Sequence, residues 1–362
     1  MDILNSFGSV NYLLIHIIAD NCGDYYFMII TKTPFRMSFF GGGTDLKEFF
    51  REHNGSVISS TFDKYCYVTV RHLPAFFDYK NQITYSTIER VSDTESIKHP
   101  MVREAMKYLD MQELVITYDA DLPARTGLGT SSSFAVGLLN AFYALKGKYV
   151  GKKKLADDAI FLERELCNEA GGWQDQIAAS FGGLNRIDFS SSGYKVSPII
   201  ISPDRKKELN NNLMLFFTGF SRYSSEIQKD SKNNIKNKTK LLLEMRDLVD
   251  VTENILVDKN NRLDEFGRLL DYAWKLKRQI GSKISTDAID ELYSIAKKAG
   301  ALGGKLLGAG GGGFLLFYVP VDYQEQVKIA LNNLLYVPFT FENTGTEIIH
   351  YSPENFIINN LN

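Results

Sequence analysis

The sequence contains few of the residues that form disulfide frameworks or zinc sites. Its three cysteines, Cys22, Cys66 and Cys167, are odd in number and far apart, so the sequence shows neither a disulfide framework nor a CxxC metal motif. The five histidines include no HExxH motif and no pair four residues apart, so nothing supports a zinc site. These absences are typical of a protein from the reducing cytoplasm.

A basic excess and a long apolar run are also missing. Lys and Arg number 41 against 43 Asp and Glu, a formal net charge of −2, which gives no electrostatic basis for binding nucleic acid. The apolar run at 10–19 is interrupted by Asn11 and His16 and is much too short to cross a bilayer. Asp2 precedes this run and no Lys or Arg occurs before Lys32, which is not typical of a signal peptide. We therefore predict a cytoplasmic protein with no nucleic-acid or membrane partner.

The composition that remains is that of a globular protein, with 44% hydrophobic and 23% charged residues over 362 positions. A chain of this length is long enough for two domains. Strand and helix patterns are mixed from Met28 to about residue 201, and after the polar segment 202–211 the second half is richer in helical patterns. We predict domains at 28–203 and 204–362, and we assign no role to residues 1–27.

Hydrophobic periodicity predicts the individual elements. Strands are predicted at 55–73, as one long strand or a hairpin, and at 113–123, 212–220, 314–320 and 346–351. Helices are predicted at 131–145, 154–168, 224–256, 262–280, 286–299 and 322–335.

Glycine and hydroxyl residues are concentrated in "LPARTGLGTSSSFAVGLLNA", residues 122–141, ahead of an apolar pattern with helical spacing. The first turn of such a helix has unpaired N–H groups and the positive end of the helix dipole, and both favour a phosphate. An ordinary capped helix after a turn gives the same pattern. No glycine–lysine pair is followed by Ser or Thr, so a phosphate here would be bound by amides and hydroxyls without a Walker lysine.

Two further glycine-rich loops lie on either side of this stretch. In "PFRMSFFGGGTDL", residues 34–46, the glycines permit close approach of the backbone to a ligand. One interpretation is that Thr44 caps the helix that follows and Asp45 complements its dipole. The other is that Asp45 accepts hydrogen bonds from sugar hydroxyls. The other loop, "KLLGAGGGGFLLFY" at 305–318, contains a GxGxxG match. We predict a helix before it and a strand after it, the reverse of the order in a dinucleotide-binding fold, which disfavours a nicotinamide enzyme.

An acidic turn follows the second loop in "ERELCNEAGGWQDQIAASFGGLN", residues 163–185. Glu163 and Glu165 lie on a predicted helix that ends at a glycine pair, and Asp175 comes shortly afterwards. Polar residues placed between Trp173 and an apolar segment are not typical of a solvated loop. Capping of the next helix by Asp175 is the alternative interpretation.

Taken together and in this order, the three loops and the acidic turn resemble the GHMP kinase superfamily, which includes galactokinase, homoserine kinase and mevalonate kinase. The resemblance extends from Met28 to the C-terminus, and "PFRMSFFGGGTDL", "LPARTGLGTSSSFA" and "KLLGAGGGGF" are similar to the first, second and third family motifs. Thr130 stands where many members have serine, which keeps the hydroxyl. The resemblance implies an α+β fold: an N-terminal α/β domain like domain 2 of ribosomal protein S5, a C-terminal ferredoxin-like domain, and an active site between them.

The resemblance also implies an ATP-dependent sugar kinase that uses Mg²⁺. The pairing of "FFGGGTDL" with "GGWQDQ" is most similar to the D-glycero-D-manno-heptose 7-phosphate kinases, with sugar-1-kinases such as fucokinase close behind. The implied reaction phosphorylates the anomeric C1 hydroxyl of D-glycero-D-manno-heptose 7-phosphate, for nucleotide-activated heptose and surface polysaccharide. The alternatives are another sugar-1-kinase and a non-catalytic sugar or nucleotide sensor. We expect a monomer or a homodimer.

Site roles follow from the resemblance position by position. The ATP phosphates would be bound by Gly127, Leu128, Gly129, Thr130, Ser131, Ser132, Gly310 and Gly311. The acceptor would be bound by Arg36, Gly42, Gly43, Thr44, Asp45 and Asp175. Asp175 would be a general base or would orient the accepting hydroxyl.

Two further assignments concern the metal and the phosphate of the acceptor. Ser131 and Glu165 would bind Mg²⁺, with Glu163 as the alternative to Glu165. The candidate cations for the acceptor's phosphate are Arg36, Lys64, Arg71 and Arg125. Any one of these is more often a surface or structural cation.

Overall fold

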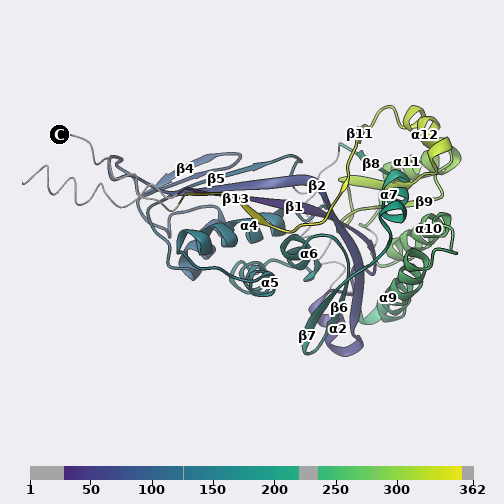
Figure 1. Cartoon of the computed structure of the whole chain (residues 1–362), viewed down its shortest axis with the longest axis horizontal. Coiled ribbons are helices and arrows are strands. Elements are labelled where there is room, and N and C mark those ends of the chain that lie inside the picture. The colour runs from purple at the N-terminus through teal and green to yellow at the C-terminus, as the bar shows by residue number, and fades with distance from the viewer. Residues whose placement is uncertain (1–27, 125, 220–234, 282, 353–362) are drawn as a thin grey trace, which may run out of the picture.

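The computed structural model describes residues 28–352, apart from residues 125, 220–234 and 282, and contains two sheets. Figure 1 shows an elongated molecule in which a long sheet with helices on one face meets a smaller sheet with its own helices. Among the described residues, no helix is both long and apolar enough to span a membrane.

The larger sheet is built on two long antiparallel strands, β1 (Met28–Phe40) and β2 (Gly55–His72). Alternating β-branched and aromatic residues predicted β2, and the structure confirms one continuous strand of 18 residues. The β2 strand pairs with β6 (Leu184–Ser190) near its start and with β5 (Leu114–Ala120) near its end. The other strands of this sheet are β3 (Asn81–Thr84), β4 (Ile88–Val91), β7 (Gly193–Pro198), β12 (Phe341–Glu342) and β13 (Glu347–Ser352).

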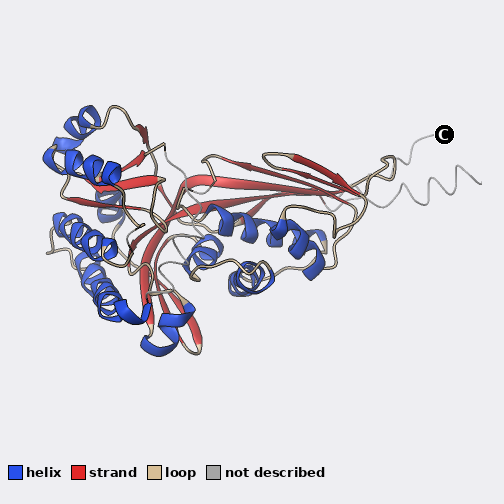
Figure 2. Cartoon of the chain, turned by 180° about the vertical axis from the view of Figure 1, so that it is seen from behind, coloured by secondary structure: helices blue, strands red, loops and turns tan. Residues whose placement is uncertain are grey.

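Helices cover one face of this sheet (Figure 2). The helix α4 (Thr130–Leu145) is apolar nearly all round, as expected for a helix buried between other layers, and it packs on β1 and β2. The helix α5 (Lys152–Phe161) continues into a π-helical turn at Leu162–Leu166, and α6 (Gln174–Phe181) packs against α4 and α5. The other helices of this part of the chain are α2 (Lys47–His53) and α3 (Pro100–Tyr108).

The second half of the chain forms the smaller sheet and its helices. Their bounds are α7 (Pro203–Asn211), β8 (Leu213–Phe217), α9 (Ile235–Val257), α10 (Asp264–Arg278), α11 (Asp287–Lys298), β9 (Gly303–Leu306), β10 (Phe314–Tyr318), α12 (Gln324–Ala330) and β11 (Leu335–Val337). The strand order is β11-β8-β10-β9, and all pairs are antiparallel. From β8 to β11 the succession is strand, helices, two strands, helix, strand, which is ferredoxin-like and confirms the predicted α+β fold.

The chain returns to the first domain after β11. The short strand β12 pairs with β2, and β13 pairs with β1 at the edge of the larger sheet. Figure 1 shows yellow β13 lying beside purple β1. The predicted second domain, 204–362, is therefore too long at its C-terminal end. The open edge of β1 supplies the backbone partners for β13, and hydrophobic periodicity carries no information about that pairing.

Three other elements differ from their predictions. The segment 202–211, predicted as a polar boundary, is mostly helix α7 with Ser202 as its N-cap. The helix predicted at 322–335 ends at Ala330. A strand, β9, precedes the third glycine loop where we predicted a helix, but β10 follows it, so the loop still lacks the helix that a dinucleotide-binding fold requires. The start of the helix predicted at 224–256 lies outside the described residues.

One hydrophobic core cluster extends through both domains. Phe39 and Phe40, at the end of β1, pack edge-on against Phe266 of α10, with ring centroids 5.5 Å and 5.2 Å apart. Edge-on aromatic pairs add stabilisation beyond the area that they bury. The end of β1 is thereby fixed against the second domain, at the junction where the candidate site lies.

Candidate active site

A pocket lies at the junction of the two domains. Its first-domain side is formed by the end of β1, the glycine loop that follows and the turn before α6; its second-domain side is formed by α9, α10, β9 and the third glycine loop. Five of the six residues predicted to bind the acceptor line this pocket: Arg36, Gly42, Gly43, Asp45 and Asp175.

The second glycine loop leads into the N-terminus of α4, as predicted. Gly129 is the N-cap residue in the left-handed conformation, with φ at 75°, which glycine adopts without strain. No side chain caps this 16-residue helix, and Thr130, Ser131 and Ser132 form its first turn. The N–H groups of that turn, together with the helix dipole, are therefore available to an anion.

Glycines also hold the second and third loops against each other. A Cβ atom on Gly127 would lie 2.4 Å from the carbonyl oxygen of Leu307, and one on Gly313 would lie 2.1 Å from that of Thr126. No side chain fits at either position. The third loop therefore positions the second by direct backbone packing.

Gly310 and Gly311, predicted to contact ATP, pack within the second domain. The N–H of Gly311 donates to the carbonyl of Ile284 at 3.0 Å, and a Cβ on Gly310 would lie 2.7 Å from the backbone of Ile284. Neither glycine lines the pocket, whereas Gly308 and Ala309 do. The structure gives this loop a supporting role, and contact of Gly310 and Gly311 with ATP stays a prediction.

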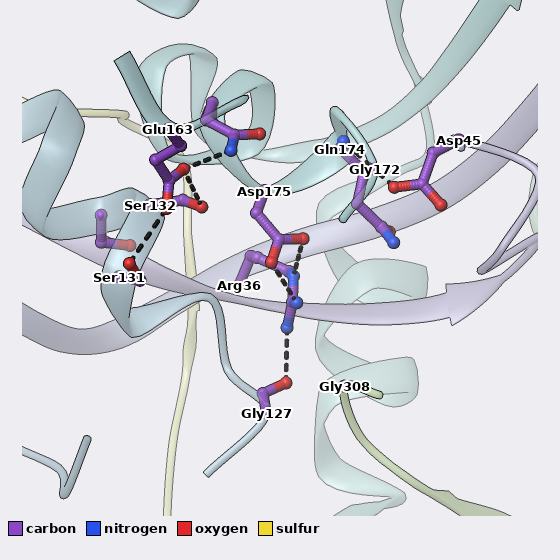
Figure 3. Close-up of polar contacts among 12 residues, drawn as sticks. Arg36, Asp45, Gly127, Ser131, Ser132, Glu163, Gly172, Gln174, Asp175 and Gly308 are labelled. Atoms are coloured by element: carbon purple, nitrogen blue, oxygen red, sulfur yellow. Dashed lines mark hydrogen bonds and ion pairs between the residues drawn. The ribbon is translucent and has the colours of Figure 1, made fainter. Parts of the chain in front are cut away.

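Glu163 lies directly beside the first turn of α4 (Figure 3). Its side chain is 1% exposed, and its carboxylate accepts hydrogen bonds from Ser131 Oγ at 2.9 Å, from Ser132 Oγ at 2.6 Å and from Gln176 Nε2. These donors offset the cost of burying the charge. The structure thus brings a hydroxyl and a carboxylate oxygen together at the start of the helix.

Glu165, the preferred metal ligand from sequence, lies elsewhere. Its side chain is 55% exposed and pairs with Lys47 at 3.1 Å. Residues two apart on a helix point to different sides, so Glu163 and Glu165 do not both face α4. The preference is therefore corrected to Glu163. The sequence held a signal for this, because Leu155 and Ala159 form a buried stripe of α5 and Glu163, four residues later, continues it.

Asp175, at the start of α6, is held by Arg36 of β1 (Figure 3). Arg36 Nε donates to Oδ1 at 2.8 Å, and its Nη2 donates to Oδ2 at 2.6 Å, which is a bidentate pair. Arg36 Nη1 donates to the carbonyl of Gly127 at 2.7 Å, and the Arg36 N–H donates to that of the fully buried Leu128. One arginine therefore joins the acidic turn to the second glycine loop. No side chain caps α6, which excludes capping as the role of Asp175.

Asp45 is 3% exposed and accepts hydrogen bonds from the N–H groups of Gly43 at 3.0 Å and Gln174 at 3.3 Å. A Cβ on Gly172 would lie 1.8 Å from its Oδ2 atom, so only glycine allows the acidic turn to pack this closely. Burial, and then the nearby Asp175 carboxylate, raise the pKa of Asp45.

Thr44 neither lines the pocket nor caps α2, whose N-cap is Leu46 without a side-chain hydrogen bond. Its hydroxyl instead donates to the carbonyls of Gly41 and Ser56, at 2.8 Å and 2.9 Å. These bonds hold the glycine loop in place behind the pocket. The structure therefore places Thr44 behind the pocket lining, and its contact with the acceptor stays a prediction.

Two lysines of the second domain line the pocket and were not singled out from the sequence. Lys277 of α10 is partly buried, and its Nζ donates to the carbonyl of Gly308 and, at 3.5 Å, to that of Leu306. Lys305 of β9 is 4% exposed and donates to the carbonyl of Phe39 at 2.7 Å. Lys277 belongs to no motif, and Lys305 is the first residue of the third glycine-rich segment but was given no role there. Burial distinguishes both from surface lysines.

The predicted phosphate cations are scattered by comparison. Arg36 lines the pocket, Lys64 pairs with Asp63 at 3.0 Å, and Arg71 lies outside the pocket lining. Arg125 lies outside the described residues.

The comparisons with known proteins agree with this geometry. The profile of the GHMP kinases N terminal domain matches residues 96–183, and that of the GHMP kinases C terminal domain matches residues 252–336. The D-glycero-alpha-D-manno-heptose 7-phosphate kinase of Campylobacter jejuni is 30% identical over 88% of this chain and 98% of its own length. The chain belongs to the GHMP kinase family. The predicted family and two-domain α+β fold are thus confirmed.

Other relatives place this GHMP kinase among sugar kinases of the same fold. A D-glycero-D-manno-heptose 1-phosphate kinase from Bacteroides thetaiotaomicron superimposes with a TM-score of 0.67 at 25% identity, covering 89% of this chain and 99% of that one. The galactokinase of Lactococcus lactis, at 16% identity and a TM-score of 0.69, covers 93% and 99% and shows the fold alone. The bifunctional fucokinase/GDP-fucose pyrophosphorylase of Arabidopsis thaliana is 27% identical over 79% of this chain and 29% of its own length.

Proposed function

We propose that this GHMP kinase transfers the γ-phosphate of ATP to the anomeric C1 hydroxyl of D-glycero-D-manno-heptose 7-phosphate, giving the 1,7-bisphosphate. The observation that carries the proposal is the Asp175–Arg36 pair, which connects the sugar pocket to the loop before α4. The Campylobacter jejuni relative, which is named a heptose 7-phosphate kinase, supports the choice of acceptor.

In this proposal, the ATP phosphates lie against the second glycine loop and the first turn of α4. Phosphoryl transfer requires positioning and charge neutralisation more than covalent catalysis. The amides and hydroxyls from Gly127 to Ser132 supply the donors, and the dipole of the buried helix supplies a fixed positive potential. This arrangement needs no Walker lysine.

Ser131 and Glu163 are the residues that would hold Mg²⁺. Their side-chain oxygens lie 2.9 Å apart, and a hydroxyl plus a carboxylate suits an ion that takes oxygen ligands and keeps several waters. Next to them, Gln176 Oε1 is buried without a hydrogen-bond partner in the described structure, which also fits a missing polar ligand. When bound, Mg²⁺ would neutralise and orient the β- and γ-phosphates.

Asp175 would act on the accepting hydroxyl. The bidentate contact with Arg36 fixes the position of its carboxylate, so that it either accepts the hydroxyl proton or orients the oxygen toward the γ-phosphate. Arg36 also reaches the carbonyl of Gly127, and its guanidinium would lie beside the charge that develops on the transferred phosphoryl group.

Asp45 would accept hydrogen bonds from other hydroxyls of the sugar. Its carboxylate lines the pocket and is fixed by two backbone N–H groups, from Gly43 and Gln174, which leaves acceptor capacity for a ligand. Gly42 and Gly43 line the pocket without side chains and leave room for the sugar ring.

An ADP-release assay with ATP, Mg²⁺ and a panel of sugars and sugar phosphates tests the proposal. We expect the highest kcat/KM with heptose 7-phosphate, and a much lower value with unphosphorylated heptose, because remote binding energy is then lost. NMR of the product should place the new phosphate on C1. A higher kcat/KM with fucose, galactose or heptose 1-phosphate rejects this acceptor while leaving a sugar kinase. Binding without ADP release from any acceptor indicates the alternative of a non-catalytic sensor.

A further inference from the structure

The second-domain side of the pocket carries positive charge without negative charge. Of the second-domain residues that the structure places in the pocket lining, the charged ones are Lys277 and Lys305, here called the lysine wall, and the rest are apolar residues or glycine. The two side chains come from different elements, α10 and β9, and both ammonium groups donate to backbone carbonyls. This concentration of buried cations needs an explanation, because lysine is rarely buried without a charged partner.

The carboxylates of the site do not neutralise the lysine wall. Asp175 is engaged on both oxygens by Arg36, and Asp45, which is near enough to favour the charged form of Lys277, is bonded to backbone N–H groups. Burial, and then the charge of Arg36, lower the pKa of Lys277 to about 8. Burial, and then the charges of Lys277 and Arg36, hold the pKa of Lys305 well below its usual value. A bound anion would restore both charges.

A buried hydroxyl supplies a second, independent observation. Ser38 lies two residues after Arg36 on β1, so both side chains are on the same face of the strand, and both line the pocket. Ser38 is 6% exposed, and its Oγ atom has no hydrogen-bond partner in the described structure. The next residue, Phe39, provides the carbonyl that Lys305 binds. The strand therefore brings an unused donor close to the lysine wall.

We propose that Lys277, Lys305 and Ser38 form an anion subsite that binds the phosphate which the acceptor already carries. Two ammonium groups and a hydroxyl provide charge-assisted hydrogen bonds to a phosphate dianion, and the surrounding apolar residues strengthen them by excluding water. The inference rests on the proposed function and deepens it, because the subsite is what selects a sugar phosphate over a neutral sugar. It assigns the acceptor's phosphate to residues that were given no role from the sequence.

The same chemistry suits a second source of phosphate, the γ-phosphate of ATP. The α4 N-terminus and the Ser131–Glu163 pair, which lie outside the pocket lining, already provide for the nucleotide, and this favours the acceptor as the occupant of the lysine wall. The two sources make different predictions. A subsite for the acceptor affects only phosphorylated acceptors, whereas a subsite for ATP affects the KM of ATP with every acceptor.

The test uses the full chain and the variants Lys277→Met, Lys305→Met and Ser38→Ala, with Lys298→Met on the exposed surface of α11 as the matched control. Methionine keeps the length of lysine, and removing a desolvated charge preserves folding, which thermal melting checks. Calorimetry measures binding of D-glycero-D-manno-heptose 7-phosphate without ATP. Kinetics then compare kcat/KM for that acceptor and for unphosphorylated heptose, and the KM of ATP with each.

We expect each lysine variant to weaken binding of heptose 7-phosphate by about 30-fold or more, and Ser38→Ala by about 5- to 10-fold. The ratio of kcat/KM for phosphorylated over unphosphorylated heptose should fall by similar factors, and Lys298→Met should change neither quantity. Equal losses on both acceptors with a raised KM for ATP overturn the inference in favour of the nucleotide. If the wild-type chain is an active heptose 7-phosphate kinase and the folded lysine variants bind this acceptor as tightly as wild type, the inference is also overturned. The proposed function then remains intact. A third outcome is that the wild-type chain binds heptose 7-phosphate tightly, the lysine variants bind it weakly, and no ADP is released. That outcome supports the subsite and rejects the proposed function.

Discussion

The two sides of the pocket are built in different ways. The first-domain part of the site, here called the motif wall, comprises Arg36 and Asp175, which line the pocket. It also includes the loop and first turn at 127–132, which Arg36 bonds at Gly127, and Glu163, which Ser131 bonds. Its charged groups are already satisfied: Asp175 by Arg36, and Glu163 by two serine hydroxyls and an amide. The lysine wall of the second domain has backbone carbonyls as its hydrogen-bond partners.

This difference shows which part of the site has its charged groups paired within the protein, before any ligand binds. The motif wall holds its geometry through internal charge pairs, as catalysis requires of groups that must be positioned before the substrate arrives. The lysine wall has backbone carbonyls instead of carboxylates as partners, so it is suited to recognition of an anion, whose charge supplies the binding free energy. The predictions below separate these two roles.

The largest expected effect is that of Asp175→Asn, which keeps the shape of the motif wall and removes its charge. We expect kcat to fall by about two to four orders of magnitude, the usual scale for losing a general base, with the KM of ATP little changed. Steady-state kinetics measure both. Asp322→Asn, at an exposed position, is the control. A near-normal kcat would contradict a catalytic role for Asp175.

The two glutamates of the π-helical turn give a matched pair of variants. Glu163→Gln should raise the Mg²⁺ concentration needed for half-maximal activity, and lower kcat/KM for Mg·ATP, by about 10- to 100-fold, because a carboxylate next to Ser131 is lost. Glu165→Gln should stay within about threefold of wild type, because an exposed ion pair with Lys47 contributes little. Mg²⁺ titrations at fixed ATP measure the contrast, and the reverse result would restore Glu165 as the ligand.

The lysine wall predicts a pH dependence that the motif wall does not. Arg36 of β1 and Lys305 of β9 face Lys277, as does Asp45 from the loop before α2, and the pKa of Lys277 is lowered to about 8. The protonated ammonium binds the phosphate, so kcat/KM for heptose 7-phosphate should fall by about tenfold for each pH unit above 8. Unphosphorylated heptose should show no such fall. With the phosphorylated acceptor, Lys277→Met should show a shallower fall, because Lys305 is then the remaining lysine of the subsite with a lowered pKa. Parallel profiles for both acceptors would contradict this assignment.

Ser131→Ala should have a smaller effect than Asp175→Asn or Glu163→Gln. One hydroxyl is lost from a loop whose other donors are mainly backbone amides, so we expect kcat/KM for Mg·ATP to fall by about tenfold with an unchanged melting temperature. Ser192→Ala, in an exposed turn, serves as the control. Unchanged kcat and KM for Mg·ATP would contradict a role for Ser131 in binding Mg·ATP.

The motif wall was accessible from the sequence because its residues lie in local patterns. A glycine loop followed by hydroxyls and a helical apolar pattern fixes where a helix begins, and a helix N-terminus attracts phosphate wherever it occurs. The choice between Glu163 and Glu165 was also within reach, since the buried stripe of α5 leads to Glu163.

The lysine wall and the final strands were not accessible in the same way. Lys277 carries no local signal in the sequence, and nothing in the third glycine-rich segment assigns a role to Lys305, its first residue. The return of β13 to β1 depends on which sheet edge is open. Both are consequences of how the two domains pack.

The sequence by itself determined the family, the fold class, most of the longer helices and strands, and the positions of the glycine-rich loops and the acidic turn, because these depend on backbone conformation and side-chain spacing over short distances. The tertiary structure alone decided that Arg36 forms an ion pair with Asp175, 139 residues away in the sequence. It also decided that Lys277 and Lys305 are desolvated at the domain junction. The physical reason is that burial and charge pairing are properties of groups brought together from distant segments. A lysine acquires its chemistry from its neighbours in space.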